Sequence, residues 1–173
     1  IKDNKIIDGP SFQLRNNRNE DCEYNSVFKK GTPRFKKKIN GTVLSLLTGG
    51  GGNSNYWHWL FDVLPRLMIL DSLKNKNQKI DFYLFPDLDK KFQIQTLDFL
   101  KISNQKRLSS KYFRHFSSNE IIITSHPYTL LNNPDLDSLN IPAWIIDYLK
   151  NKFLNVMTQN KNNSKSFPSK IYI

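Results

Sequence analysis

The chain has 173 residues, of which 38% are hydrophobic and 24% are charged, and its formal net charge is +11. This composition excludes a disordered chain and suits one hydrophobic core, because domains most often contain roughly 100 to 200 residues. No apolar run approaches the roughly 18 to 20 residues of a membrane-spanning helix, and the single cysteine, Cys22, excludes an internal disulfide.

The positive charge fits three kinds of partner: nucleic acid, an anionic membrane surface, and anionic small molecules such as sugar nucleotides. The lysines are spread along the chain, and only residues 34–38 form a dense basic run. We therefore expect most of the charge to lie on solvated surface. The basic residues form no single stripe interleaved with aromatic residues, which argues against a nucleic-acid partner.

The N-terminal residues, 1–40, are polar and interrupted by Gly9-Pro10 and by the glycine and proline at 31 and 33. We expect irregular structure with short strands there. Residues 42–48 (TVLSLLT) predict a buried strand that enters the glycine run 49–52. A helix over 54–73 follows, and Pro65 inside it predicts either a kink or the start of a new helix.

The same alternation continues to the end of the sequence and makes residues 41–173 one Rossmann-like domain. A βαβαβαβ order with short connections predicts an open parallel α/β sheet with helices on both faces. Ligands in such a fold bind outside the carboxyl ends of the strands, where the glycine run lies. The expected strands are 80–85, 120–125 and 170–173, and the expected helices are 90–101 and 141–156.

Three polar residues share one face of the first predicted helix. His58, Asp62 and Arg66 are spaced i, i+4 and i+8, so they drift by only about 80° around the helix axis. His58 could remove a proton from a hydroxyl group, Asp62 could orient the imidazole or itself be the base, and Arg66 could hold a phosphate or carboxylate. Alternatively, Asp62 and Arg66 form an i,i+4 ion pair while His58 caps the helix or fills space.

The glycine run and the other histidines also have two interpretations each. Backbone N–H groups of Gly50, Gly51 and Gly52 could cradle phosphate oxygens, or the run is a flexible hinge. It matches neither a P-loop nor the G-x-G-x-x-G register. His115 and His126 are too isolated to predict a zinc site with His58, so we expect no metal. Residues 125–128 follow a predicted strand and could line the ligand-binding cleft at the carboxyl ends of the strands; alternatively, His126 is incidental.

The segment 55–71, reading NYWHWLFDVLPRLMILD after a glycine-rich loop, closely resembles the N-terminal signature of glycosyltransferase family 61. Weaker matches are Phe92-Gln93, residues 97–102 and the closing residues 168–173. The resemblance covers about residues 44–173. Its motif positions are Asn55, His58, Trp59, Asp62, Pro65 and Arg66.

The resemblance implies the N-terminal domain of a GT-B enzyme, which transfers a sugar from a nucleotide-sugar donor to a glycan or other hydroxyl acceptor with inversion. It implies no cofactor or metal, catalytic roles for His58, Asp62 and Arg66, and substrate contacts from Asn55, Trp59 and the glycine run. The family's second, donor-binding half is absent from this sequence, so we expect the chain to be inactive alone. A bacterial source would place it in the cytoplasm, with peripheral membrane association as one option, and a eukaryotic source in the Golgi or endoplasmic reticulum lumen.

Two other functions remain open on the sequence. The chain could be a non-catalytic module that binds an anionic polymer, either polysaccharide or nucleic acid, in which case its binding should depend strongly on salt. It could also be a structural Rossmann-like domain that has lost its chemistry.

Overall fold

The computed structural model describes residues 13–15, 18–20, 33–48, 54–72, 78–128 and 134–159. Near the N-terminus, β1 (Gln13–Arg15) and β2 (Arg18–Glu20) pair in antiparallel fashion. The glycine run, Cys22 and the expected strand 170–173 lie outside the described residues.

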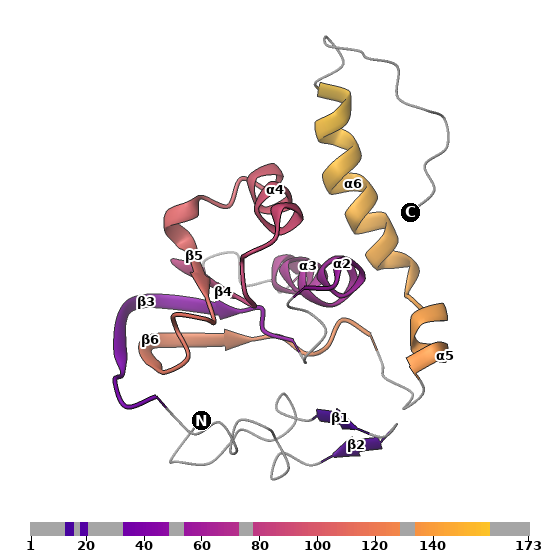
Figure 1. Cartoon of the computed structure of the whole chain (residues 1–173). Helices are drawn as coiled ribbons and strands as arrows, with labels where there is room; N and C mark the ends of the chain where they lie inside the picture. The colour runs from indigo at the N-terminus through magenta and orange to yellow at the C-terminus, as the bar shows by residue number, and fades with distance from the viewer. Residues whose placement is uncertain are drawn as a thin grey trace.

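The main sheet has four strands that all run parallel, in the order β5-β4-β3-β6 (Figure 1). This arrangement confirms the prediction of an open parallel α/β sheet. β3 and β6 begin several residues before the predicted starts, and β5 was not predicted, because three residues carry too little pattern to be recognised. The strands are β3 (Lys37–Ser45), β4 (Phe82–Phe85), β5 (Arg107–Ser109) and β6 (Phe116–Ile123).

A bulge in the central strand β3 requires glycine. The register of β3 against β6 shifts between Ile39 and Thr42, and Gly41 has φ +146°, which L-residues rarely adopt. A Cβ on Gly41 would lie 2.7 Å from Oδ2 of Asp81, the atom that accepts a 2.9 Å hydrogen bond from the Thr42 amide. The bulge therefore fixes the alignment of β3 with its neighbours.

The helix after β3 changes its winding at the proline. It begins as α2 (Tyr56–His58), passes through the π-helical turn η3 (Trp59–Val63) and continues as α3 (Pro65–Ser72). The Leu64 amide donates to the Trp59 carbonyl, five residues back, at 3.1 Å. Because proline has no N–H, a new α-helix starting at Pro65 costs no hydrogen bond, which confirms the second of the two sequence expectations.

The remaining helices follow the predicted alternation, with small changes of bounds. α4 lies between β4 and β5, and α6 lies beside α3, separated from β6 by the unpredicted short helix α5 (Figure 1). A single 3-10 turn, η4, leads into β5. The bounds are α4 (Lys91–Phe99), η4 (Asn104–Lys106), α5 (Pro134–Leu139) and α6 (Ala143–Gln159).

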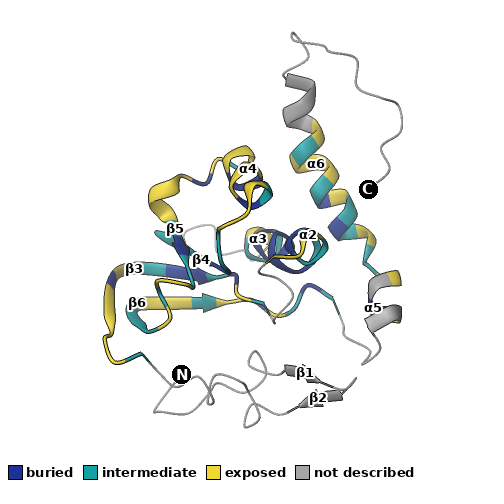
Figure 2. Cartoon of the chain, viewed as in Figure 1, coloured by how far each residue is buried: buried dark blue, intermediate teal, exposed yellow. Residues whose placement is uncertain are grey.

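The two faces of the sheet have different coverings. Leu44 and Phe85 face a large core that contains Trp59 of η3, Leu97 of α4 and Tyr148 of α6. The opposite face carries a smaller cluster of Ile39, Val43, Leu84 and Leu108, against which Phe82, Phe113 and Phe116 pack. Burial is deepest between the sheet and the helices (Figure 2). Within the described residues the long helices thus cover one face, whereas helices on both faces were expected.

The parts of the chain that the structure describes include no helix that is both long and apolar enough to span a membrane.

Candidate functional site

A buried, hydrogen-bonded carboxylate lies in the π-helical turn and belongs to Asp62. Asp62 is only 7% exposed. Its Oδ2 lies 2.7 Å from Nδ1 of His58, one turn earlier, and its Oδ1 accepts a 2.7 Å hydrogen bond from the Tyr128 hydroxyl. Both carboxylate oxygens therefore have a partner, which holds the side chain in one orientation.

The His58 side chain is more exposed to solvent than that of Asp62, at 36% against 10%. With Nδ1 directed at the carboxylate, the other ring nitrogen, Nε2, makes no hydrogen bond to any described residue. The ring of Trp57 lies against that of His58 at an interplanar angle of 89°, with 5.0 Å between the ring centres. A partly exposed imidazole ring is thus held in a fixed orientation.

Arg66 lies on the same helix but makes different contacts from those expected. It is 7% exposed, and its Nε donates to the Asp62 backbone carbonyl at 2.9 Å. Its Nη1 donates to the carbonyl of Thr124, just after β6, at 3.4 Å. Burial lowers the pKa of Arg66, and the Asp62 charge opposes that effect. The guanidinium joins the helix to the end of β6, and anion binding by Arg66 stays a prediction.

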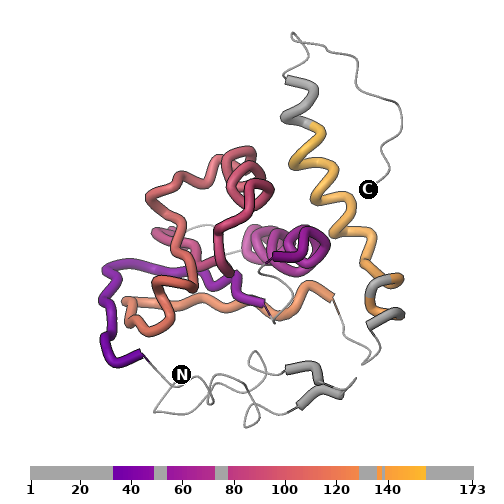
Figure 3. The backbone as a smooth tube through the Cα atoms, in the orientation of Figure 1, coloured from indigo at the N-terminus to yellow at the C-terminus, as the bar shows by residue number. Residues whose placement is uncertain are grey.

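The segment after β6 completes the cluster. It runs beside α2 and α3 in the tube drawing (Figure 3), which brings Tyr128 and His126 to Asp62. Nδ1 of His126 bonds the Tyr128 carbonyl at 2.9 Å, while its Nε2 lies 3.9 Å from Oδ1 of Asp62. Their rings meet edge to face, with centres 4.5 Å apart. The loop therefore contacts the helix that carries His58 and Asp62, and its predicted place in the wall of a cleft stays a prediction.

Burial sets the protonation states of the two loop residues. The pKa of His126 is lowered, chiefly by burial, although its bond to the Tyr128 carbonyl and the Asp62 charge act in the opposite direction. A neutral His126 that donates from Nδ1 has a bare Nε2, which explains why Nε2 stays beyond hydrogen-bond distance of the carboxylate. The pKa of Tyr128 is strongly raised by burial and then by its bond to Asp62. Tyr128 therefore remains a phenol that donates to Asp62.

Two further buried polar residues lie at this edge of the sheet. Asp137 of α5 is 5% exposed, and its charge acts on the pKa values of both His126 and Tyr128. The Thr124 hydroxyl is buried and has no hydrogen-bond partner among the described residues. The site thus combines two buried acids, one buried guanidinium and a buried hydroxyl with the rings of His58, His126 and Tyr128.

Asn55 and Trp59, the predicted substrate-binding residues on this helix, have structural contacts. Oδ1 of Asn55 accepts from the Trp57 and His58 amides at 2.8 and 3.4 Å, so Asn55 caps α2 and sets the start of the turn that carries His58. Trp59 is 0% exposed, and its Nε1 donates to Oγ1 of Thr96 at 2.8 Å. The buried Trp59 side chain offers no exposed surface for the substrate contact that the sequence predicted.

Other predictions about the site are tested less directly. Gly50, Gly51 and Gly52 fall outside the described residues, so their phosphate-binding role stays a prediction. His115 lies apart from the cluster, with its Nδ1 2.8 Å from the Pro33 carbonyl. In the described ranges, no group of three or more His, Cys, Asp or Glu side chains is arranged to hold a metal ion. The sequence placed Tyr128 only in a loop that could line the cleft and gave Asp137 no role, because only the fold brings Tyr128 to Asp62 and Asp137 near Tyr128.

The helix from Asn55 and the loop after β6 together form one polar site at the carboxyl end of a parallel sheet. Comparison of the chain with protein-family models, with curated proteins and with solved structures finds no match.

Proposed function

We propose that this chain is the N-terminal domain of an inverting glycosyltransferase of the GT-B type, in which His58 is the catalytic base and Asp62 holds it in place. The observation that carries the proposal is the 2.7 Å contact between Nδ1 of His58 and the buried Asp62 carboxylate. The resemblance of residues 55–71 to glycosyltransferase family 61 supports the reaction class.

The fold is compatible with this assignment. Numbered by their order in the sequence, the four strands of the main sheet run 3-2-1-4, the order of the first four strands of a doubly wound nucleotide-binding fold. His58, Asp62 and Tyr128 follow the carboxyl ends of β3 and β6, where such folds bind ligands. In a GT-B enzyme this edge would face the second domain across the donor site.

The proposed chemistry requires one base. The acceptor oxygen forms a bond to the anomeric carbon of the donor, the bond from that carbon to the diphosphate breaks, and the nucleoside diphosphate leaves with the electron pair. The acceptor proton goes to Nε2 of His58. When Nδ1 carries the proton bonded to Asp62, Nε2 has a free lone pair, and the carboxylate stabilises the imidazolium that forms.

This arrangement favours His58 over Asp62 as the base, two roles that the sequence left open. Both oxygens of Asp62 are hydrogen-bonded and the side chain is buried, whereas the His58 side chain is 36% exposed and its Nε2 has no hydrogen-bond partner among the described residues. Tyr128 and Arg66 then act through Asp62 and its backbone, as positioning residues.

The test uses a protein in which this chain is joined to a donor-binding half. We expect His58→Gln to lower kcat by about 10²–10⁴-fold, the usual contribution of a general base. Asp62→Asn should cause a comparable loss, because an amide cannot stabilise the imidazolium. Asp147→Asn, on the exposed face of α6, is the matched control and should leave kcat unchanged. A normal kcat in His58→Gln would overturn the assignment of the base.

On this proposal the chain by itself transfers no sugar, because a GT-B enzyme needs two domains to hold the donor and the acceptor. Incubation of the 173-residue chain with radiolabelled nucleotide sugars and glycan acceptors checks this expectation. Turnover of any donor would show that the chain is not a fragment of the active unit.

A further inference from the structure

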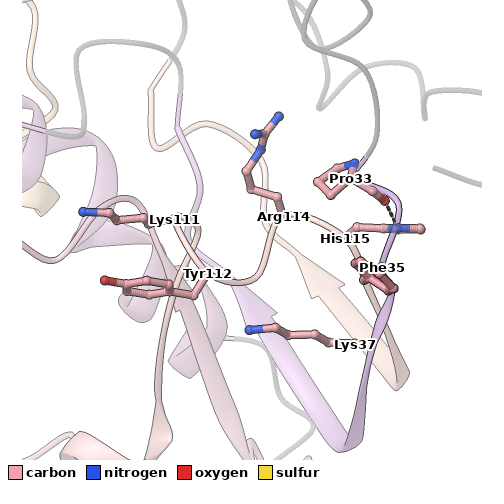
Figure 4. Close-up of a pocket in the computed structure, with 7 residues that line it drawn as sticks. All are labelled: Pro33, Phe35, Lys37, Lys111, Tyr112, Arg114 and His115. Atoms are coloured by element: carbon pink, nitrogen blue, oxygen red, sulfur yellow. Dashed lines mark hydrogen bonds between the residues drawn. The ribbon is translucent and has the colours of Figure 1, made fainter.

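A basic hollow lies at the opposite end of the sheet from Asp62. Its volume is about 330 Å³, and its lining residues are Pro33, Phe35, Lys37, Lys111, Tyr112, Arg114 and His115 (Figure 4). They come from two segments about 75 residues apart, which meet because Lys37 of β3 pairs with Phe116 of β6. The hollow is therefore created by the pairing of β3 with β6.

Cations dominate this surface. Lys37, Lys111 and Arg114 line the hollow, and the exposed residues Arg34 and Lys36 flank it on the same segment as Phe35. None of the lining residues is an Asp or a Glu. Unlike most of the spread lysines, these five charges reinforce one another, and their potential would attract a surface that carries many negative charges.

Two aromatic rings project from the same surface. Phe35 is 83% exposed and Tyr112 is 63% exposed, although both are large enough to favour burial. The guanidinium of Arg34 lies 5.9 Å from the ring centre of Phe35, and Nζ of Lys111 lies 5.7 Å from that of Tyr112. Rings with cations beside them suit the boundary between phosphate headgroups and acyl chains, where the ring enters and the cation stays at the phosphates.

The lining also argues against other anionic ligands. Adenine edges are read mainly by amides and cytosine edges by carboxylates, and no Asp, Glu, Asn or Gln lines the hollow. Phe35 has no polar group to offer either. Cationic side chains that lack such neighbours bind phosphates, and exposed aromatic rings insert into an apolar layer.

We propose that this hollow and its rim are a docking surface for an anionic phospholipid membrane. Five cations supply the attraction to the headgroup phosphates, and Phe35 and Tyr112 enter the headgroup region. The surface lies at the amino ends of β3 and β6, whereas Asp62 and Tyr128 follow their carboxyl ends. β3 has nine residues and so spans roughly 25 to 30 Å. The catalytic edge would therefore remain accessible to solvent on a docked chain.

The experiment is co-sedimentation of the full chain with vesicles of phosphatidylcholine alone and of phosphatidylcholine mixed with phosphatidylglycerol. We expect binding to the anionic vesicles only, and we expect added salt to weaken it. The variant Lys111→Gln/Arg114→Gln should bind about 25-fold more weakly, at roughly fivefold per cation. Lys91→Gln/Lys150→Gln removes the same charge from exposed positions of α4 and α6, and should bind as the unchanged chain does.

Phe35→Ala separates a membrane from other polyanions. It should weaken vesicle binding about tenfold, because the ring would enter the headgroup region, and it should leave any binding to dextran sulfate or an oligonucleotide unchanged. Circular dichroism melting verifies that each variant is folded. Two results would overturn the proposal: no binding to anionic vesicles, whether or not polyanions bind through Lys111 and Arg114, or equal losses in the two double variants.

Discussion

The two ends of β3 and β6 use polar residues in opposite ways. At the carboxyl end, Asp62 is buried and both its oxygens are hydrogen-bonded. At the amino end, Lys37, Lys111 and Arg114 are exposed around a hollow. Buried polar groups need partners and so fix a geometry, whereas exposed charges remain free to meet a partner from outside. The first end suits chemistry at a defined point, and the second suits attachment to a surface.

The two ends also differ in what they contribute to folding, and the largest expected effect tests this. Asp62→Ala leaves the Tyr128 hydroxyl without its acceptor and removes the charge that balances buried Arg66. We expect the free energy of unfolding to fall by about 3 kcal/mol. Lys111→Gln/Arg114→Gln should change it by less than about 0.5 kcal/mol. Urea unfolding of both variants provides the measurement, and similar losses at the two ends would contradict the comparison.

Two tyrosines, one at each end of the sheet, test the same difference in stability, because replacing either by phenylalanine removes a single oxygen atom. Tyr128→Phe removes the 2.7 Å hydrogen bond to Oδ1 of Asp62, so the free energy of unfolding should fall by about 1–2 kcal/mol. Tyr112→Phe removes a hydroxyl from a side chain that is 63% exposed, and should have almost no effect. Thermal melting of the two variants compares them directly. Equal melting temperatures would show that the bond to Asp62 adds nothing to stability.

The spacing of residues along the sequence predicted only those contacts, at either end of the sheet, that join residues of one segment. The i,i+4 rule brought His58 to Asp62, and the βαβ alternation predicted the parallel sheet. Tyr128 could not be placed at Asp62, because this contact joins residues 66 positions apart and depends on β6 lying next to β3. The same pairing brings Lys111 near Lys37, so the dense basic run of residues 34–38, which had no partner on the sequence, becomes part of the rim of a hollow.

The burial of Trp59 shows a different limit of the sequence. A motif position with an aromatic ring suggests substrate contact as readily as core packing. Trp59 lies in the π-helical turn before Pro65, and its ring is 5.8 Å from that of Phe85 in the core. Where a side chain points depends on how the turn is wound, and regular helical spacing does not describe a π turn.

The smallest expected effect is a pH dependence of the free energy of unfolding, which comes from His126 at the carboxyl end of the sheet. Burial lowers the pKa of His126 in the folded chain, whereas an unfolded histidine titrates near about 6.5. As the pH falls below about 6.5, the unfolded chain binds a proton that the folded chain does not bind. The free energy of unfolding should therefore decrease with falling pH until the lower folded pKa is reached, and then level off. Urea unfolding across this window measures the decrease, which His126→Asn should make shallower. An unchanged slope in that variant would mean that His126 is not the group that couples stability to pH at this site.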